Sequence, residues 1–207
     1  MAKNKLLIPK GYLSWSAIDM WKRAPYRYVK NYMLGDRDPQ FEGYNFGKIV
    51  SDSLETGEDT DDDFVNLAIQ HFPKYDIQEH IIKAPFKSPY GEVVLLGKLD
   101  TFRKSPPAFR EYKTGKSWTQ RKAENHKQLV HYATLIWLTE GRVPVDCYLD
   151  WLETERLADG PIYPTGKPIT SFKVSIGLSE VLGYLAEVSK IAKEIDQEYR
   201  RQLAKIA

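Results

Sequence analysis

Residues 97–116 read GKLDTFRKSPPAFREYKTGK, two β-forming stretches joined at Ser-Pro-Pro. Ser and Pro between two such stretches are typical of a turn, so the segment predicts a pair of antiparallel strands. Side chains alternate between the two faces of a strand, which puts Glu111 and Lys113 on the same face. If the strands pair around the turn, Asp100 lies across from Glu111, at the distance of about 5 Å that separates cross-strand neighbours.

Two facing carboxylates destabilise a sheet unless a cation neutralises them, and the spacing alone leaves two interpretations open. In one, Lys98 or Lys113 forms an ordinary cross-strand salt bridge with the acids, worth under about 1 kcal/mol when exposed. In the other, the two carboxylates and the backbone carbonyl of Tyr112 bind Mg²⁺ or Mn²⁺, and Lys113 orients an attacking water or stabilises charge on a phosphate. A third reading, the acid pair of a sugar hydrolase, gives Lys113 no role.

The composition of the whole chain fits one α/β domain, with 207 residues of which 42% are hydrophobic. No apolar run reaches 18 residues, and the opening MAKNKLLIPKGY lacks the long apolar core of a signal peptide. We therefore expect no membrane insertion or export, and a cytoplasmic location. The single cysteine, Cys147, excludes internal disulfides and all-cysteine metal sites within one chain, and we expect it to be buried.

Hydrophobic periodicity and turn residues on both sides of the central pair predict alternating helices and strands. The predicted helices are 14–34 with a break at Pro25, 46–55 ending at Gly57, 60–72 capped by Thr60 or Asp61, 117–141 stopped by Gly141, and 178–205. The predicted strands are 77–87, 92–104, 108–115, 143–153 and 170–176, with a loop over 160–169. We read the chain as a single domain with an N-terminal helical segment (1–45), a catalytic core (46–153) and a C-terminal hairpin and helix (154–207).

Charges are segregated along the chain although the net charge is only +2. Residues 1–34 hold seven Lys or Arg and one Asp, whereas 50–64 hold seven acids and no base. The stretch 113–127 is basic again and includes Lys116, Arg121 and Lys122. Such runs are often no more than solvated faces, but they are also suited to steering a polyanion such as DNA.

Five motifs in order resemble the RecB-type branch of the PD-(D/E)XK nuclease superfamily. They are LSWSAIDMWKRAPYRYVKNYM (13–33), FGKIVSDSLE (46–55), GKLD (97–100), EYKTG (111–115) and QLVHY (128–132). The resemblance implies a restriction-endonuclease-like core, in which a mixed central β-sheet is flanked by helices. It also implies a DNA nuclease, most simply a stand-alone exonuclease like those of phages and mobile elements or of CRISPR adaptation.

Carried over by position, the resemblance makes Asp100 and Glu111 the metal ligands and Lys113 the catalytic lysine. Gln128 and Tyr132 form the helix motif. Spaced by four residues, they share one helix face, which approaches the DNA end or backs the active site.

The chain departs from the family pattern at two places. Ser51 stands where the family has a metal-binding His, and a hydroxyl is a poor substitute for an imidazole. Glu55, one turn later, is a candidate to supply an oxygen instead. Ala24 precedes Pro25 where the iron–sulfur members have a Cys, so we expect no iron–sulfur cluster.

Without a cluster, the ends of the domain must be held by packing. Trp15, Trp21, Tyr26 and Tyr28 are the aromatic residues expected to do so. The same aromatics could instead stack on unpaired bases, with Arg23 and Arg27 along the nucleic-acid backbone.

The sequence thus predicts a Mg²⁺- or Mn²⁺-dependent deoxyribonuclease for recombination or repair, which binds single- or double-stranded DNA ends. A second copy of the chain or a recombination or helicase protein is a candidate partner. Ser51 motivates the alternative of a weakened or inactive nuclease-fold subunit that binds DNA.

Overall fold

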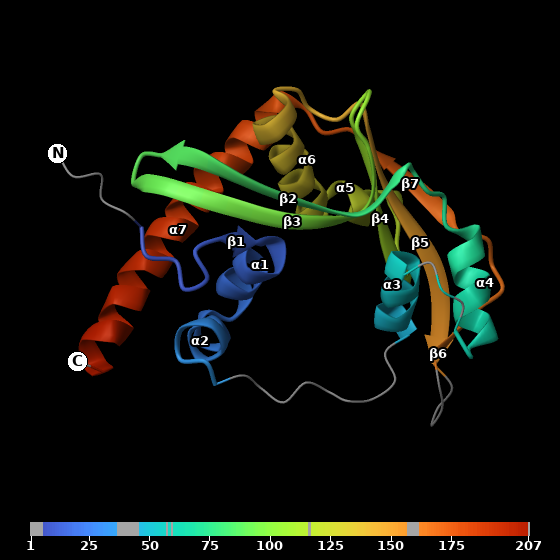
Figure 1. The fold of residues 1–207 in the computed structure, drawn as a ribbon, viewed down its shortest axis with the longest axis horizontal. Coiled ribbons are helices and arrows are strands. Elements are labelled where there is room, and N and C mark those ends of the chain that lie inside the picture. The colour runs from blue at the N-terminus through green and yellow to red at the C-terminus, as the bar shows by residue number, and fades with distance from the viewer. Residues whose placement is uncertain are drawn as a thin grey trace.

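The computed structural model describes residues 6–36, 46–56, 58, 60–115, 117–156 and 162–206. In this part of the chain a mixed seven-stranded sheet is flanked by helices, and a long helix closes the C-terminal end (Figure 1). The predicted α/β class with a mixed central sheet is confirmed. The strands are β1 (Leu13–Ser14), β2 (Ile77–Ser88), β3 (Gly91–Arg103), β4 (Ala108–Gly115), β5 (Asp146–Arg156), β6 (Ile162–Pro164) and β7 (Thr170–Val174).

The centre of the sheet is β3, which β2 pairs antiparallel from end to end. On the other edge of β3, β1 pairs parallel at Leu95 and Leu96, and β4 pairs antiparallel at residues 101–103. From there β4 continues as the parallel partner of β5, whose other neighbours, β6 and β7, are antiparallel. The predicted hairpin and its third strand are therefore present, and β4 leaves β3 after only three pairs.

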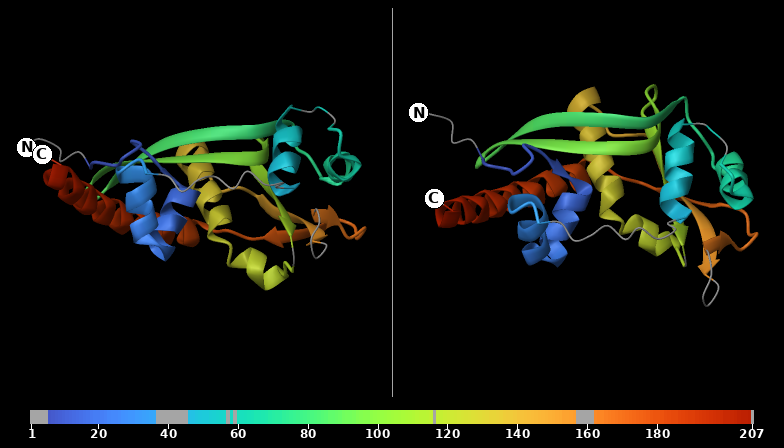
Figure 2. Two further views of the ribbon diagram at one scale, coloured as in Figure 1. Left: turned by 90° about the horizontal axis from the view of Figure 1, so that it is seen from below. Right: turned by 60° about the horizontal axis from the view of Figure 1, so that its bottom comes forward.

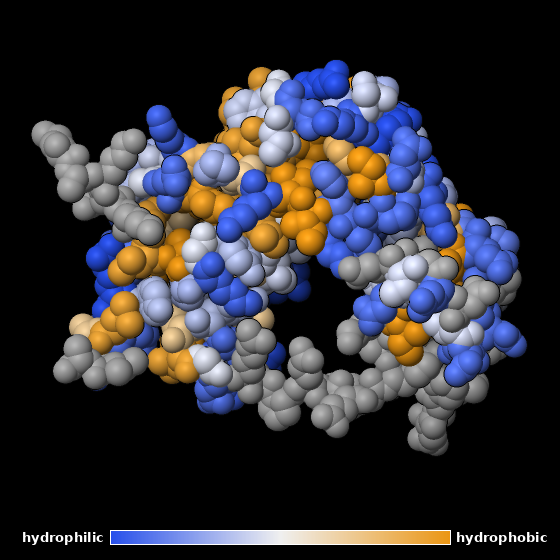
Figure 3. Space-filling model, viewed as in Figure 1, coloured by the Kyte–Doolittle hydropathy of each residue, from blue (hydrophilic) through white to orange (hydrophobic). Residues whose placement is uncertain are grey.

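Helices cover both ends of this sheet (Figures 1 and 2). They are α1 (Trp15–Arg23), α2 (Pro25–Tyr28), the π-helix η1 (Val29–Met33), α3 (Phe46–Thr56), α4 (Asp63–His71), α5 (Gln120–Glu124), α6 (Lys127–Glu140) and α7 (Leu178–Ile206). The N-terminal helices lie near α7 at one end, whereas α3 and α4 lie beside β5 at the other. On the face shown in Figure 3, a hollow separates the surface over α1 and α2 from the surface over α3 and α4.

The main core surrounds α6, which contacts β2, β3 and α7. Residues 129–136 of this helix are all buried, as expected of a helix that is apolar on most sides. At the crossing with β3, Gly97 leaves room for the helix, since a Cβ atom there would lie 2.5 Å from the Leu135 Cδ1 atom. The glycine of the G-x-x-D motif thus allows α6 to approach the strand that carries Asp100.

A smaller cluster holds α3 and α4 against the far end of the sheet. Its buried members are Val50, Val65, Ile69, Phe72 and Leu152. Val50 faces this cluster from α3, and its neighbour Ser51 is thereby placed beside β4. This packing places α3, which the sequence predicted over 46–55, beside the strands that carry the acidic residues.

The N-terminal segment is only partly helical. Ser14 caps α1 by accepting a hydrogen bond from the Ala17 amide, and Pro25 ends that helix and begins α2, as the sequence predicts. Residues 6–12 precede the short strand β1, which no sequence pattern indicated. Residues 37–45 and Gly57, where a helix end was expected, lie outside the described part of the chain.

Two helix predictions need correction. The helix expected over 117–141 is two helices, because the backbone becomes extended at His126 (φ −79°, ψ 97°), whose amide donates to the Ala123 carbonyl in place of the Lys122 carbonyl that a continuous helix would use. Gly141, with a φ of +70°, ends α6 as predicted. The helix expected from Thr60 begins at Asp63, because the Asp62 carboxylate accepts the Val65 amide.

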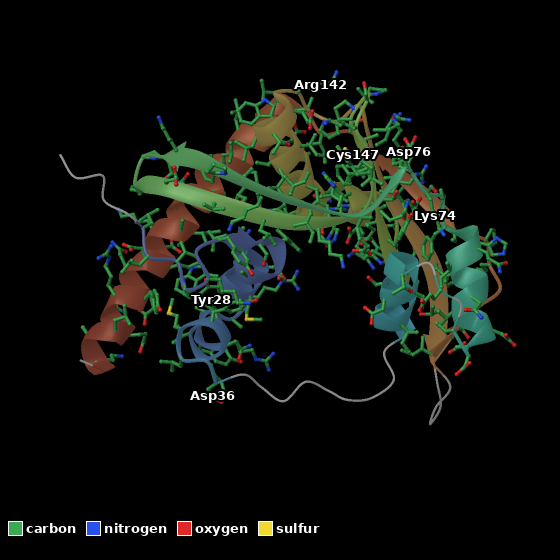
Figure 4. All side chains as sticks on the ribbon, in the orientation of Figure 1. Tyr28, Asp36, Lys74, Asp76, Arg142 and Cys147 are labelled. Atoms are coloured by element: carbon green, nitrogen blue, oxygen red, sulfur yellow. The ribbon has the colours of Figure 1, made fainter. Side chains whose placement is uncertain are left out.

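The C-terminal part follows the predicted order of strand and helix. The loop expected over 160–169 contains the short strand β6, whereas the strand expected over 170–176 is confirmed as β7. Cys147 is buried on β5, as expected, and is labelled in Figure 4. No helix among the described residues is long and apolar enough to cross a membrane.

Candidate active site

The strands β3 and β4 separate at the acidic pair. Their last ladder pair is Thr101 with Arg110, and the same register places Asp100 opposite Glu111. Beyond that point the Tyr112 amide donates to the Asp100 Oδ2 atom at 2.6 Å. A side-chain carboxylate thus replaces a strand carbonyl as the partner of this amide, and the two strands open around the facing acids.

Burial and like charge act together on this pair. Burial raises the pKa of Asp100 well above its ordinary value, and the neighbouring Glu111 carboxylate raises it further, although the Tyr112 amide and Lys113 act in the opposite direction. Glu111 is only 3% exposed, and its Oε2 atom has no hydrogen-bond partner within the described part of the chain. A buried carboxylate oxygen without a partner is costly, and a hard cation such as Mg²⁺ or Mn²⁺ is the kind of group that satisfies it.

Lys113 lies on the same face as Glu111, as strand alternation predicts. Its Nζ atom donates to Glu111 Oε1 at 2.5 Å and to Gln128 Oε1 at 3.1 Å. Burial lowers the pKa of Lys113, but the adjacent Glu111 carboxylate outweighs that effect, and the pKa is raised. The lysine is therefore a charged donor held against the acidic pair.

The helix motif lies behind the acidic pair. Gln128 Nε2 donates to Glu111 Oε1 at 2.7 Å and to the Tyr132 hydroxyl oxygen at 2.8 Å. The amide orientation follows from its partners, because an ammonium group can only donate and a carboxylate can only accept. His126, which the sequence did not single out for this site, also contacts Gln128 Oε1 through its Nε2 atom at 3.1 Å. The sequence left two positions open for this motif, near the DNA end or behind the active site. In the structure Gln128 lies behind the candidate site, in contact with Glu111.

The acidic pair and Lys113 line a pocket of about 300 Å³. Its lining residues are Val50, Ser51, Glu79, Asp100, Glu111, Tyr112, Lys113 and Thr114. Ser51 lines the pocket, and its role there stays a prediction. Glu55 lies on α3, but its side chain is outside the described residues.

Two further observations bear on metal binding. Glu79, from β2, is a third acid in the pocket that the sequence did not indicate. Within the described residues, no group of three or more His, Cys, Asp or Glu side chains is arranged to hold a metal ion as it stands. The Tyr112 side chain points away to the α4 end, where its hydroxyl donates to the Pro73 carbonyl oxygen, and metal binding by its backbone carbonyl stays a prediction.

Among the described residues, the structure does not bring the predicted Arg23, Arg27, Arg121 and Lys122 into the lining of the pocket. Arg23 pairs with Asp19 on α1, Arg27 lies on α2, and both Arg121 and Lys122 lie on α5. Lys116 lies outside the described residues. Contact of these residues with DNA stays a prediction.

The N-terminal aromatics mostly pack internally. Tyr28 is 1% exposed, stacks on Tyr32 and meets the edge of Trp21, and it is labelled in Figure 4. Trp15 is partly buried against the main core. Tyr26 was expected to pack as well, but it is 69% exposed, because it lies on the outer side of the single turn α2.

Comparison with known protein families gave no matching family, and no curated protein matches the chain. A solved structure titled "Crystal structure of SSO0001" matches with a TM-score of 0.43 and 13% sequence identity. The match covers 89% of this chain and 78% of that one.

Proposed function

We propose that this chain is a divalent-metal-dependent nuclease that hydrolyses phosphodiester bonds in DNA. The observation that carries the proposal is the buried Glu111 Oε2 atom, which has no partner in the described residues and lies opposite Asp100 in a pocket that also holds Lys113. An exposed cross-strand salt bridge does not account for this arrangement, because Glu111 is 97% buried and only one of its oxygens meets the lysine.

Asp100 and Glu111 would hold Mg²⁺ or Mn²⁺, with the Tyr112 backbone carbonyl as a third oxygen. When bound, the ion supplies Lewis acidity toward a phosphate oxygen and lowers the pKa of a bound water. An ammonium group has three hydrogens to donate, and two of those on Lys113 are directed at Glu111 and Gln128. The third is suited to orienting an attacking water or to binding a phosphate oxygen.

Gln128 fixes the ligand geometry from behind. It holds Glu111 Oε1 and leaves Glu111 Oε2, which has no hydrogen-bond partner in the described residues, available to the proposed cation. Tyr132 in turn accepts the second amide hydrogen, so the amide cannot rotate without losing two hydrogen bonds. Such outer contacts typically change metal affinity or activity about 10–100-fold when removed.

The resemblance in sequence favours an exonuclease that acts on DNA ends in the cytoplasm. The test is to incubate end-labelled and circular DNA, single- and double-stranded, with the purified chain and Mg²⁺ or Mn²⁺. Cleavage should require the metal, and Lys113→Ala should abolish it without changing the melting temperature by more than a few degrees.

Lys173→Ala is the matched control for the lysine substitution. Lys173 is also a strand lysine that pairs with an acid, Asp146, but it does not line the pocket. This variant should cut like the wild type, whereas wild-type cleavage by Lys113→Ala would show that the site assignment is wrong. Failure to bind Mn²⁺, together with DNA affinity that is unchanged in Asp100→Ala, would favour the inactive DNA-binding subunit.

A further inference from the structure

Glu79 occupies an irregular position of β2, opposite the acidic pair. The ladder pairs Gln78 with Thr101 and His80 with Leu99, so the same register puts Glu79 across from Asp100. Glu79 itself makes no ladder pair and has a φ of +50°, in the left-handed region that a glutamate seldom adopts. The acids of β2, β3 and β4 therefore form one row, Glu79, Asp100 and Glu111, at the end of the hairpin that contacts α3 (Figure 1).

The Glu79 side chain forms an ion pair with Lys98 of the neighbouring strand β3. Its Oε2 atom lies 2.7 Å from Lys98 Nζ, and the side chain is only 9% exposed. Lys98 is more open, with 39% of its side chain exposed. The pair thus joins an acid that lines the pocket to a more exposed lysine that is not part of the lining.

One oxygen of Glu111 indicates that this row of acids binds a cation. The Glu111 Oε2 atom is buried in the same pocket and has no partner among the described residues. Ser51, also in the lining, offers a hydroxyl oxygen and no charge. A divalent cation between Asp100 and Glu111 would satisfy the buried oxygen, and the remaining acid of the pocket with a described side chain is Glu79.

We propose that Glu79 is the third acidic ligand of the cation site, and that Lys98 holds its carboxylate aside until the cation binds. This inference rests on the proposed function, since it takes the same ion. The proposal explains why no three His, Cys, Asp or Glu side chains among the described residues are arranged to hold a metal ion. The Glu79 carboxylate is paired with Lys98 instead. On binding, the carboxylate exchanges its lysine partner for the ion, directly or through one of the waters that Mg²⁺ usually retains.

The test is Mn²⁺ titration by calorimetry, without DNA. Glu79→Gln and Glu79→Asp should each weaken Mn²⁺ binding about 10–100-fold. Asp keeps the charge and tolerates a positive φ better than most residues, so this variant separates a ligand from a distant charge. Glu187→Gln is the matched control, because Glu187 also pairs with a lysine, Lys22, but lies on α7 away from the pocket, and it should bind like the wild type.

The lysine supplies a second test that does not alter the strained position. Lys98→Gln should tighten Mn²⁺ binding in the wild-type background and change nothing in Glu79→Gln. Wild-type affinity in Glu79→Asp, or an equal effect of Lys98→Gln in both backgrounds, would overturn the ligand role while leaving the nuclease proposal intact. If the wild type itself binds no Mn²⁺, the proposed function fails and this inference fails with it.

Discussion

Gly97→Ala tests whether the close crossing of β3 and α6 organises the candidate site. Gly97 opens the G-x-x-D motif, and α6 carries the Q-x-x-x-Y motif. A methyl group at this position would lie 2.5 Å from Leu135 Cδ1 and 3.0 Å from Tyr132 Cε1. The substitution therefore pushes on the helix at the turn that holds Tyr132.

The magnitude follows from how far these atoms must move. Carbon atoms in contact prefer separations of about 3.5–4.0 Å, so Leu135 must shift by roughly 1 Å and the Tyr132 ring by about half as much. Both side chains are buried in the core around α6, where little space exists for another rotamer. Overpacking of this kind costs about 1–3 kcal/mol of unfolding free energy. Because the Tyr132 hydroxyl accepts from Gln128, the displacement also reaches Glu111.

The assay is urea denaturation of the variant, followed by tryptophan fluorescence and circular dichroism. Gly183→Ala is the matched control, because Gly183 lies on the outer side of α7 with no atom within 4 Å of an added Cβ. There the same change should stabilise the chain by about 1 kcal/mol, since alanine is the better helix former. If Gly97→Ala is as stable as Gly183→Ala, the crossing is looser than described and the coupling of the two motifs is refuted.

Two further predictions concern buried polar groups. Asp150→Ala should lower the free energy of unfolding by about 3–5 kcal/mol, because it removes the carboxylate that pairs with the Arg110 guanidinium at 2.8 Å in a largely buried site. Asp146→Ala, on the same strand but with a partly exposed carboxylate whose two cation partners also reach solvent, should cost under about 1 kcal/mol, and equal urea midpoints for the two variants would contradict the argument. Burial lowers the pKa of His131 to about 4, although its hydrogen bond to the Leu96 carbonyl raises it. As the pH falls from about 6.5 to about 4, the unfolded chain gains a proton on this residue that the folded chain excludes, so unfolding free energy falls by up to about 3 kcal/mol. His131→Gln should show a smaller loss over this range in urea titrations, and an unchanged pH dependence would contradict the assignment.

The acidic pair was predictable because it depends on local geometry. Once the turn at Ser-Pro-Pro joins two strands, the register follows from counting residues on either side, and Asp100 must meet Glu111. The pairing of Gln128 with Tyr132 depends only on the helical repeat. Neither conclusion needs knowledge of the rest of the fold.

The sequence was less informative where distant segments or the conformation of a single residue decide the structure. The break between α5 and α6 depends on the extended backbone of His126 alone, within a pattern that is helical on both sides. The strand β1 is only two residues long and exists because β3 offers a free edge at Leu95 and Leu96. Hydrophobic periodicity is read over ten or more residues, so it predicts neither the helix break nor a strand of two residues.

Glu79 was missed for a related reason. The stretch IQEHIIK alternates poorly, but nothing in it predicts a positive φ at a glutamate. The strain is maintained because the ladder resumes at His80, whose ring stacks on Phe102 at 4.8 Å. A backbone irregularity held by regular pairing on both sides is more common at functional sites than elsewhere, which is consistent with a ligand role.

Ser51, which stands where the resemblance implies a histidine, lines the same pocket as Glu79. The implied histidine is a neutral ligand, whereas Glu79 on β2 is the charged ligand that we propose in the same pocket. Such an exchange would favour hard cations, because an oxygen would replace a nitrogen and the proposed acidic ligands would number three instead of two. A chain that had simply lost its metal site would have no reason to keep Glu111 Oε2 buried without a partner in the described structure. Under the proposed function, Ser51 therefore reflects a changed set of metal ligands and not the loss of the site.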